Sequence, residues 1–246
     1  MKTPVLLLML VAMATAPAAF AVEAASAARA DYVPCKIHQT THATFPLRLL
    51  RRGVTQGQAT LVLELDPTGR IADKLVIQYT HRELADEAER TVETWTFEPG
   101  RVKGEPAVSI VSITFDFTVE GIVVYEKHPD SALEEAFAAQ LPYFAHGADT
   151  LDQRLTAVET PSPIYPQTWI EAGRAGSVTI RFFIDESGRA RLPAVIHSGD
   201  MWLASAARAA VKQWRFAPPR HHGQPVLAQA EQVFVFAPAA KVETKS

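Results

Sequence analysis

The chain has 246 residues, of which 48% are apolar and 21% are charged, and its formal net charge is −3 at pH 7. This composition excludes a disordered or fibrous chain and predicts two globular domains of about 100 residues each. The charge provides no global basic field, so the sequence predicts no nucleic-acid partner. Cys35 is the only cysteine, which excludes an intramolecular disulfide and leaves it free or paired between chains.

Residues 1–21 have the pattern of a secretory signal peptide. Lys2 supplies the positive charge, Val5 to Met13 form an unbroken apolar run, and Ala19-Phe20-Ala21 is a small-x-small cleavage site. We expect cleavage after Ala21; the alternative is an uncleaved inner-membrane anchor over Val5–Val22, which barely reaches spanning length. Residues 22–41 are rich in alanine and then polar, which predicts a flexible lead-in.

Residues 42–120 are predicted to form a first domain that opens with Phe45-Pro46 and a short helix over 47–52. The apolar side of a strand follows at every second residue, in Ala59, Leu61, Leu63 and Leu65. Asp66-Pro67-Thr68-Gly69 has the composition of a turn, whose backbone Asp66 would bond, and it predicts a returning strand over 71–79.

A helix and a third strand complete this first unit. Thr80-His81-Arg82-Glu83 has the capping-box pattern and predicts the start of the helix. Its apolar face contains Leu84, Ala88, Val92 and Trp95, so we expect the tryptophan to close the core rather than to stack on a ligand. Alternation over Val111–Phe117 predicts the third strand.

Residues 121–160 are predicted to be a structured linker. Ile122–Tyr125 continue the alternating pattern and are expected to extend the preceding strand, and Ser131–Leu141 have the pattern of a helix. The segment is too short to bury a core of its own.

Residues 161–240 are predicted to form a second domain with the same order of elements. The expected elements are an opening Tyr165-Pro166, a short helix over 167–172, a strand over 178–184, a turn at Asp185-Glu186-Ser187-Gly188, a returning strand over 189–197, a helix after Asp200 that ends near Trp214, and a last strand over 232–236. Pro193 indicates that the returning strand lies at an edge, and Asp200 is the expected N-cap.

The two units repeat at a constant offset, for example 214 − 95 = 119. The repeated residues are turn formers and large apolar groups: Gly57/Gly176, Asp66/Asp185, Gly69/Gly188, Trp95/Trp214, Phe97/Phe216, Pro99/Pro218, Gly104/Gly223, Pro106/Pro225, Phe115/Phe234 and Phe117/Phe236. A duplication that preserves a scaffold and no reactive set predicts a binding module used twice, and no enzyme.

The second unit resembles the C-terminal domain of TonB, the periplasmic energy-transducing protein. The matching residues are Tyr165-Pro166, Gly176 to Phe182, Ile184 to Gly188, Trp214-Arg215-Phe216-Ala217-Pro218, Gly223-Gln224-Pro225-Val226 and the strand Val233 to Phe236. The first unit looks like a degenerate copy, with Phe45-Pro46 and Trp95-Thr96-Phe97-Glu98-Pro99 at the corresponding places.

The resemblance implies an α+β fold, with each copy a three-stranded antiparallel sheet packed on one or two helices. In that family an extended receptor segment is added as a strand at the sheet edge. The resemblance therefore implies a partner-binding edge in the second copy. Its residues are Gln229, Glu231, Gln232, Val233 and Val235, together with Tyr165 and Pro166. The counterpart of this edge in the first copy would be Val111–Phe117.

The implied partner is an envelope protein such as an outer-membrane TonB-dependent receptor, and the implied place is the periplasm. A role in TonB-type energy transduction and transmembrane transport would follow. The chain departs from a full transducer because only residues 22–41 separate the apolar segment from the first domain, and they are not rich enough in proline to form a stiff spacer.

Two other interpretations stay open. In the first, the sheet edges pair with each other or across a homodimer, which would make the chain a structural envelope protein. In the second, the chain is an enzyme or a metal-dependent factor, with His221-His222 or the Cys35/His38 pair as metal ligands. Two ligands do not close a metal site, so the sequence predicts no metal and no cofactor. It contains neither a G-x-S-x-G nor an H-E-x-x-H motif, so it predicts no catalytic residue.

Overall fold

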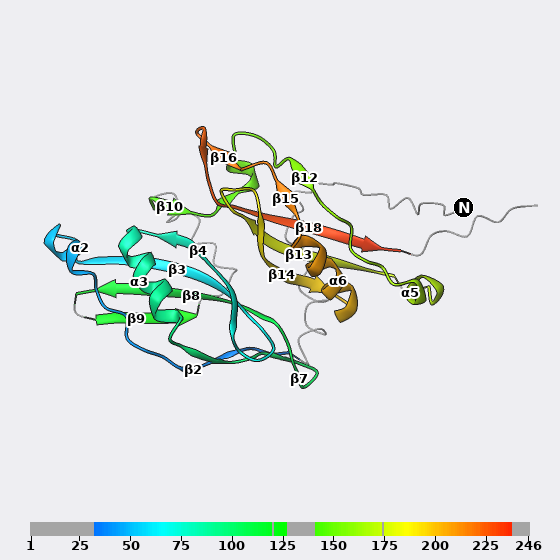
Figure 1. The fold of residues 1–246 in the computed structure, drawn as a ribbon, viewed down its shortest axis with the longest axis horizontal. Helices are drawn as coiled ribbons and strands as arrows, with labels where there is room; N and C mark the ends of the chain where they lie inside the picture. Colours follow the sequence, from blue (N-terminus) through cyan, green and yellow to red (C-terminus); the bar gives the residue numbers. More distant parts are fainter. Residues whose placement is uncertain (1–31, 120, 127–140, 174, 238–246) are drawn as a thin grey trace, which may run out of the picture.

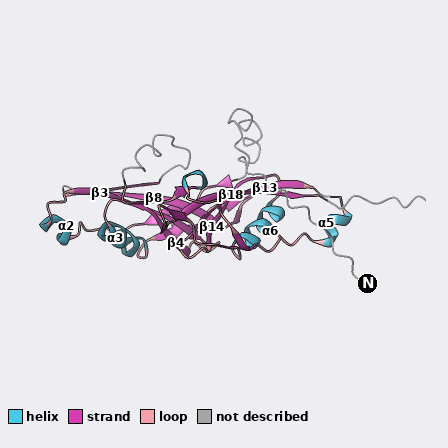
Figure 2. Ribbon diagram, turned by 90° about the horizontal axis from the view of Figure 1, so that it is seen from above, coloured by secondary structure: helices cyan, strands magenta, loops and turns pink. Residues whose placement is uncertain are grey.

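The structure is a computed structural model that describes residues 32–119, 121–126, 141–173 and 175–237. It contains two main sheets, with strand orders β10-β4-β3-β8-β9 and β11-β18-β13-β14, which we call the first and the second domain. The two sheets lie side by side along the long axis of the molecule, and each packs on its own helices (Figures 1 and 2). The α+β fold with two related units is therefore confirmed.

The first domain has the predicted order of elements. They are α2 (Leu47–Arg51), β3 (Gln56–Leu65), β4 (Ile71–Tyr79), α3 (Arg82–Val92) and β8 (Ser109–Thr118). The alternating side chains Ala59, Leu61, Leu63 and Leu65 are completely buried, because they face α3 from the central strand. Trp95 is 6% exposed and donates its indole N–H to the carbonyl of Thr41, so it belongs to the core as predicted.

The second domain repeats this arrangement. Its elements are α5 (Gln167–Glu171), β13 (Gly176–Ile184), β14 (Ala190–Ser198), α6 (Met201–Val211) and β18 (Ala228–Phe236). β13 is central, between β14 and β18, which places Pro193 on an edge strand as expected. Trp214 is buried and donates its indole N–H to the carbonyl of Pro161, as Trp95 does to Thr41.

Short strands and one turn of 3-10 helix complete the described fold. They are β1 (Tyr32–Val33), β2 (Lys36–Gln39), β5 (Thr96–Glu98), β6 (Arg101–Val102), β7 (Glu105–Pro106), β9 (Gly121–Glu126), β10 (Tyr143–Phe144), β11 (His146–Gly147), η1 (Ala148–Thr150), β12 (Ala157–Glu159), β15 (Arg215–Phe216), β16 (Arg220–His221) and β17 (Gln224–Pro225). None of the helices in the described residues combines the length and the apolar character that crossing a bilayer requires.

The repeated turn residues have a structural role. Asp185 Oδ1 accepts hydrogen bonds from the backbone N–H of Ser187 and of Arg189, and Asp66 bonds its own turn in the same way. Gly188 has a φ of +85°, and a Cβ there would lie 2.0 Å from the carbonyl oxygen of Phe216. The turn therefore needs glycine because the chain after the tryptophan packs directly against it.

Both helices begin where the sequence predicts, but the predicted cap is present only in the second domain. Asp200 caps α6, because its side chain accepts hydrogen bonds from the backbone N–H of Trp202 and of Leu203. The capping box predicted for α3 is wrong: His81 is the N-cap residue and its side chain makes no capping bond. Thr80 Oγ1 instead accepts a hydrogen bond from the backbone N–H of Gln58 on the neighbouring strand.

The most consequential difference from the sequence prediction concerns the strand after β8. Ile122–Tyr125 do not extend β8 but lie in β9, which turns back and pairs antiparallel with it from Thr118↔Gly121 to Ile113↔Glu126. An alternating pattern fits an extension and a returning strand equally well, so local sequence cannot separate them. Val111–Phe117 therefore lie in a strand that is paired on both sides, and the predicted counterpart edge is wrong.

The described part of the predicted lead-in is ordered against the first domain. β2 pairs with β5, and β1 pairs with β6, so residues 32–39 extend along the chain that follows Trp95. Cys35 lies in the chain between β1 and β2, is 7% exposed and forms no disulfide. Residues 22–31 and nearly all of the helix expected over Ser131–Leu141 lie outside the described residues.

An apolar contact joins the two domains. Val62 on β3 packs in a buried cluster with Phe183, Leu192 and Leu227 of the second domain. Leu192 adopts a φ of +49°, a left-handed conformation that costs energy for a branched side chain and is held here by its complete packing. The two sheets are thus coupled through a separate apolar core that lies between the domains.

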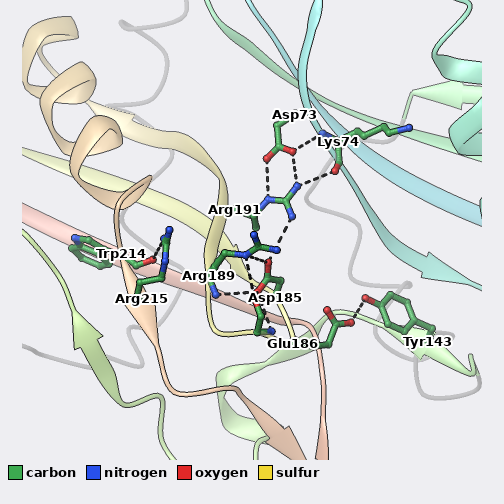
Figure 3. Close-up of polar contacts among 10 residues, drawn as sticks. Asp73, Lys74, Tyr143, Asp185, Glu186, Arg189, Arg191, Trp214 and Arg215 are labelled. Atoms are coloured by element: carbon green, nitrogen blue, oxygen red, sulfur yellow. Dashed lines mark hydrogen bonds and ion pairs between the residues drawn. The ribbon is translucent and has the colours of Figure 1, made fainter.

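Ion pairs also join the two domains, and Figure 3 shows the one between Arg191 and Asp73. Arg191 Nε donates to Asp73 Oδ2 at 3.0 Å, and this hydrogen bond is the main reason why the pKa of Arg191 is raised. The carboxylate of Glu64 is 3% exposed; Lys212 Nζ donates to its Oε1 at 2.6 Å, and Arg208 Nη2 lies 2.8 Å from the same oxygen as an ion pair without hydrogen-bond geometry.

The segment between the repeats contacts both sheets. Tyr143 of β10 pairs with Tyr79 of β4 and stacks on its ring at 4.8 Å. Its hydroxyl donates to Glu186 Oε1 in the second domain at 2.6 Å, and burial raises the pKa of this tyrosine (Figure 3). A few residues later, β11 pairs with β18, so β10 and β11 tie the first sheet to the second.

Replacing Phe183 with alanine is expected to lower the free energy of unfolding by about 3–5 kcal/mol, because it empties the centre of the interdomain cluster. Urea denaturation followed by circular dichroism measures the loss. Val233→Ala on the exposed face of β18 is the matched control and should change stability by less than about 0.5 kcal/mol. A loss below about 1 kcal/mol for Phe183→Ala would contradict the coupling.

Candidate functional site

The outer edge of β18 is open along most of its length. β13 pairs with every residue of β18 on one side, from Ile184↔Ala228 to Gly176↔Phe236. On the other side, β11 pairs only with the beginning of the strand, at Ala228 and Gln229. Within the described residues, no strand covers residues 230–236, which at the ordinary rise of an antiparallel strand form an edge of about 20 Å.

The hydrogen bonds show which backbone groups point away from the sheet. His146 N–H donates to the carbonyl of Leu227, and the side-chain amide of Gln232 donates to the carbonyl of Val233. Because N–H and C=O of one strand residue point to the same side and alternate along the strand, Glu231, Val233 and Val235 direct their backbone groups outward. The carbonyl of Val233 is thus masked by a local side-chain bond that an incoming strand must displace.

The side chains of β18 alternate between the core and the outer face of the sheet. Phe234 and Phe236 are buried against the helix side, whereas Val233 is 52% and Val235 is 69% exposed. Glu231 is exposed and accepts a hydrogen bond from Arg181 Nε on β13 at 2.7 Å. An exposed pair of this kind contributes no more than about 1 kcal/mol to stability, so the edge can exchange it for other partners.

The structure places most of the predicted partner-binding residues on this edge or at its end. Tyr165 packs edge-on against Phe236 with ring centroids 5.5 Å apart, which fixes the end of β18. Gln229 lies on the strand, but β11 already pairs with it. Pro166 is the N-cap of α5 and lines a groove beside α6 rather than the edge.

A histidine cluster holds the short strand that covers the beginning of β18. The ring of His146 stacks on that of Phe144 with centroids 4.3 Å apart, and the ring of His221 lies tilted at 4.5 Å from it. The ring of His222 lies 4.0 Å from that of His221. His221 Nδ1 lies 2.7 Å from the carbonyl of Thr150, so this nitrogen is the protonated one. Sequence reasoning missed His146, because no local pattern connects it with residues so far along the chain.

The same cluster does not form a metal site. Among the described residues, no group of three or more histidine, cysteine, aspartate or glutamate side chains is arranged to hold a metal ion. Asp152 accepts hydrogen bonds from the backbone N–H of Gly223 and, with a smaller effect, of His222; these bonds lower the pKa of its carboxyl group and support the hairpin between β16 and β17. Cys35 is buried while His38 is exposed, so the C-x-x-H pair does not converge on one ion.

Comparison with known proteins gives two matching segments. The family described as Gram-negative bacterial TonB protein C-terminal matches residues 41–119 and 161–238. The solution NMR structure of the Pseudomonas aeruginosa TonB CTD is 28% identical over 39% of this chain and 93% of that chain, with a TM-score of 0.31. The TonB2 protein from Vibrio anguillarum is 23% identical over 46% and 99%, with a TM-score of 0.28. No curated protein matches the chain.

The histidine cluster predicts a pH dependence of stability. Burial, followed by the charges of His221 and His222, lowers the pKa of His146 below its ordinary value of 6.5. At a pH near and below 6.5, His146 is therefore protonated more in the unfolded chain than in the folded one. The free energy of unfolding consequently falls as the pH drops from 7 towards 5. Urea denaturation at several pH values should show a shallower fall for His146→Asn. His197→Asn, at an exposed histidine, is the control, and equal slopes for His146→Asn and wild type would refute the prediction.

Proposed function

The chain belongs to the family of TonB C-terminal domains and contains two copies of that domain, and from this premise we propose that it captures an extended segment of an envelope protein along β18. The observation that carries the proposal is the open edge over residues 230–236, with Val233 and Val235 exposed beside it. The family acts in TonB-type energy transduction and its domains are non-catalytic, so the proposed activity is binding rather than catalysis.

The first domain illustrates the mode of binding proposed for the second. β9 pairs antiparallel with β8 at six positions, on the edge that corresponds to the open edge of β18. The chain therefore fills the first edge itself and leaves the second edge for a partner, which gives one captured segment per chain. This division of roles leaves the duplicated domain with a single edge for strand capture.

The captured segment would be extended and mainly apolar. Three outward residues of β18 offer backbone donors and acceptors, and each new hydrogen bond contributes about 0.5–1.5 kcal/mol net. Val233 and Val235 would bury their exposed surface under apolar side chains of the added strand. The side chain of Gln232 would leave the carbonyl of Val233, so the local bond is exchanged rather than lost.

The proposed place of action is the periplasm, and the proposed partner is an outer-membrane TonB-dependent receptor or another envelope protein. The signal-like residues 1–21 and the family of the two domains support this assignment. A second copy of the chain is the alternative occupant of the edge, because two β18 strands would satisfy the same backbone groups; the chain would then have a structural role.

Replacing Val233 with proline tests whether the edge binds. Proline removes an outward N–H without breaking a bond to β13, so we expect receptor-derived extended peptides to bind at least about tenfold more weakly, as measured by calorimetry. Val233→Thr keeps the N–H and the branched shape and should bind like wild type. Equal binding by the proline and threonine variants would exclude this edge as the site.

Site-specific photo-crosslinking in cells, with the probe at Glu231, tests the identity of the partner. The side chain is exposed beside the open edge, so a captured strand should come within reach of the probe. We expect an adduct with an outer-membrane receptor or another envelope protein. A probe at Glu159, an exposed residue of β12, is the control and should not give this adduct. An adduct only with a second copy of the chain would replace partner capture by the structural role.

A further inference from the structure

A second surface of the second domain has the features of a binding site and uses other residues than the β18 edge. A groove of about 610 Å³ runs between α6 and the segment that leads into α5. The two helices lie next to each other at one end of the molecule (Figures 1 and 2). All its lining side chains are uncharged, and its floor is made of small residues such as Ala206 and Ala209.

Two tryptophans form one part of the groove. Trp202 is 65% exposed, and its ring meets that of Trp169 edge to face, with centroids 6.4 Å apart and an interplanar angle of 85°. Ile164, on the leading segment, is 82% exposed. Large apolar side chains that gather at one exposed place mark an interaction site more often than single exposed residues do.

The first domain shows what the groove replaces. At the offset of 119, Trp202 corresponds to Glu83, since 202 − 119 = 83, and Glu83 pairs with Arg52 at 3.0 Å. The tryptophan thus stands where the first domain has an exposed ion pair. An exposed ion pair is solvated and stable without a partner. Covering an exposed indole with apolar groups, in contrast, lowers the free energy because it removes apolar surface from water.

The floor of the groove differs from the first domain in the same way. Ala206 corresponds to Glu87 and Ala209 to Arg90, which pair with each other at 2.6 Å. Glu87 also accepts a hydrogen bond from the backbone N–H of Thr44 at 2.9 Å, which ties the leading segment of the first domain to α3. The second domain has alanines at these two positions, so it lacks this ion pair and this tie.

We propose that this groove binds a proline-containing segment in the polyproline II conformation that is uncharged where it touches the groove. The flat indole rings offer faces on which proline rings pack, and an extended helix of this type enters a shallow aromatic groove with little loss of entropy. The absence of charge from the lining disfavours a charged segment, which would lose hydration without gaining a counter-charge.

The polar groups of the groove favour the same occupant. The indole N–H of Trp202 and the hydroxyls of Ser162 and Ser205 have no hydrogen-bond partner among the described residues, and they lie around an apolar floor. A polyproline II backbone leaves its carbonyls unbonded and can accept from these donors. The carbonyls in the middle of an α-helix are already bonded within the helix, so a helical partner would leave the donors unused.

Binding at this groove is compatible with strand capture at β18. Pro166 lines the groove, while the neighbouring Tyr165 packs against Phe236 at the end of β18. The two surfaces therefore meet at one end of the second domain but use different residues. A partner with an extended segment and a proline-rich segment would engage both.

The test follows the indole N–H resonances of nitrogen-15-labelled protein during titration with a synthetic (Ala-Pro)₆ peptide. The chain has four tryptophans. We expect the signals of Trp169 and Trp202 to shift and saturate, while that of Trp95 stays in place because its N–H is bonded to Thr41 in the first domain.

The double variant Ala206→Glu/Ala209→Arg restores the residues of the first domain and should bind the peptide at least about tenfold more weakly. Trp202→Ala, at an exposed position, should weaken binding to a similar extent and serves if the double variant fails to fold. Val233→Pro is the matched control: it disables the β18 edge and should leave the affinity for this peptide unchanged.

Three results would overturn the proposal. The first is a titration to millimolar peptide in which Trp169 and Trp202 do not move. The second is unchanged affinity in the folded double variant or in Trp202→Ala. The third is a shift of the two signals with protein concentration alone, which would assign the groove to a second copy of the chain.

Discussion

The unpaired edge of a β-sheet is the constraint around which this molecule is arranged. A small antiparallel sheet has two edges with unpaired backbone donors and acceptors, and each edge can pair with another strand. In the first domain, the chain that follows β8 forms β9 and pairs with one of these edges. In the second domain, β11 closes only the beginning of the corresponding edge, and Gln232 masks one carbonyl farther along.

The contact between the domains depends on residues that differ between the copies. Phe183 corresponds to Glu64, since 183 − 119 = 64, and the two residues make different kinds of contact with the other domain. Phe183 enters the apolar cluster with Val62, whereas Glu64 receives Lys212 and Arg208 from the other domain. The corresponding faces of the two sheets have thus diverged so that they are complementary to each other. The contact between them holds the second sheet, with the open edge of β18, against the first domain.

The two copies have also diverged on their helix faces. The outer face of α3 is covered by ion pairs that include Glu83 and Arg90, and it needs no further partner. The corresponding face of α6 presents Trp202 and alanines beside a groove. Together with the closed edge of β8, this contrast places both proposed binding surfaces on the second domain.

Local sequence patterns determined the elements of this protein. The alternation from Ala59 to Leu65 and the repeated Trp95 and Trp214 predicted strands, helices and core correctly, because burial on one face leaves a periodic record in the sequence. The Asp–Gly turns and the cap at Asp200 were predictable for the same reason, since their hydrogen bonds close within a few residues.

Only the tertiary structure decided how these elements meet. Ile122–Tyr125 pair back onto β8, Thr80 bonds a neighbouring strand instead of its helix, and the ring of His146 packs against that of His221. In each case the deciding contact joins surfaces distant in sequence, and a periodic pattern contains no information about which surfaces come together. The sequence therefore determined two copies of one fold, and the packing decided which copy keeps an open edge.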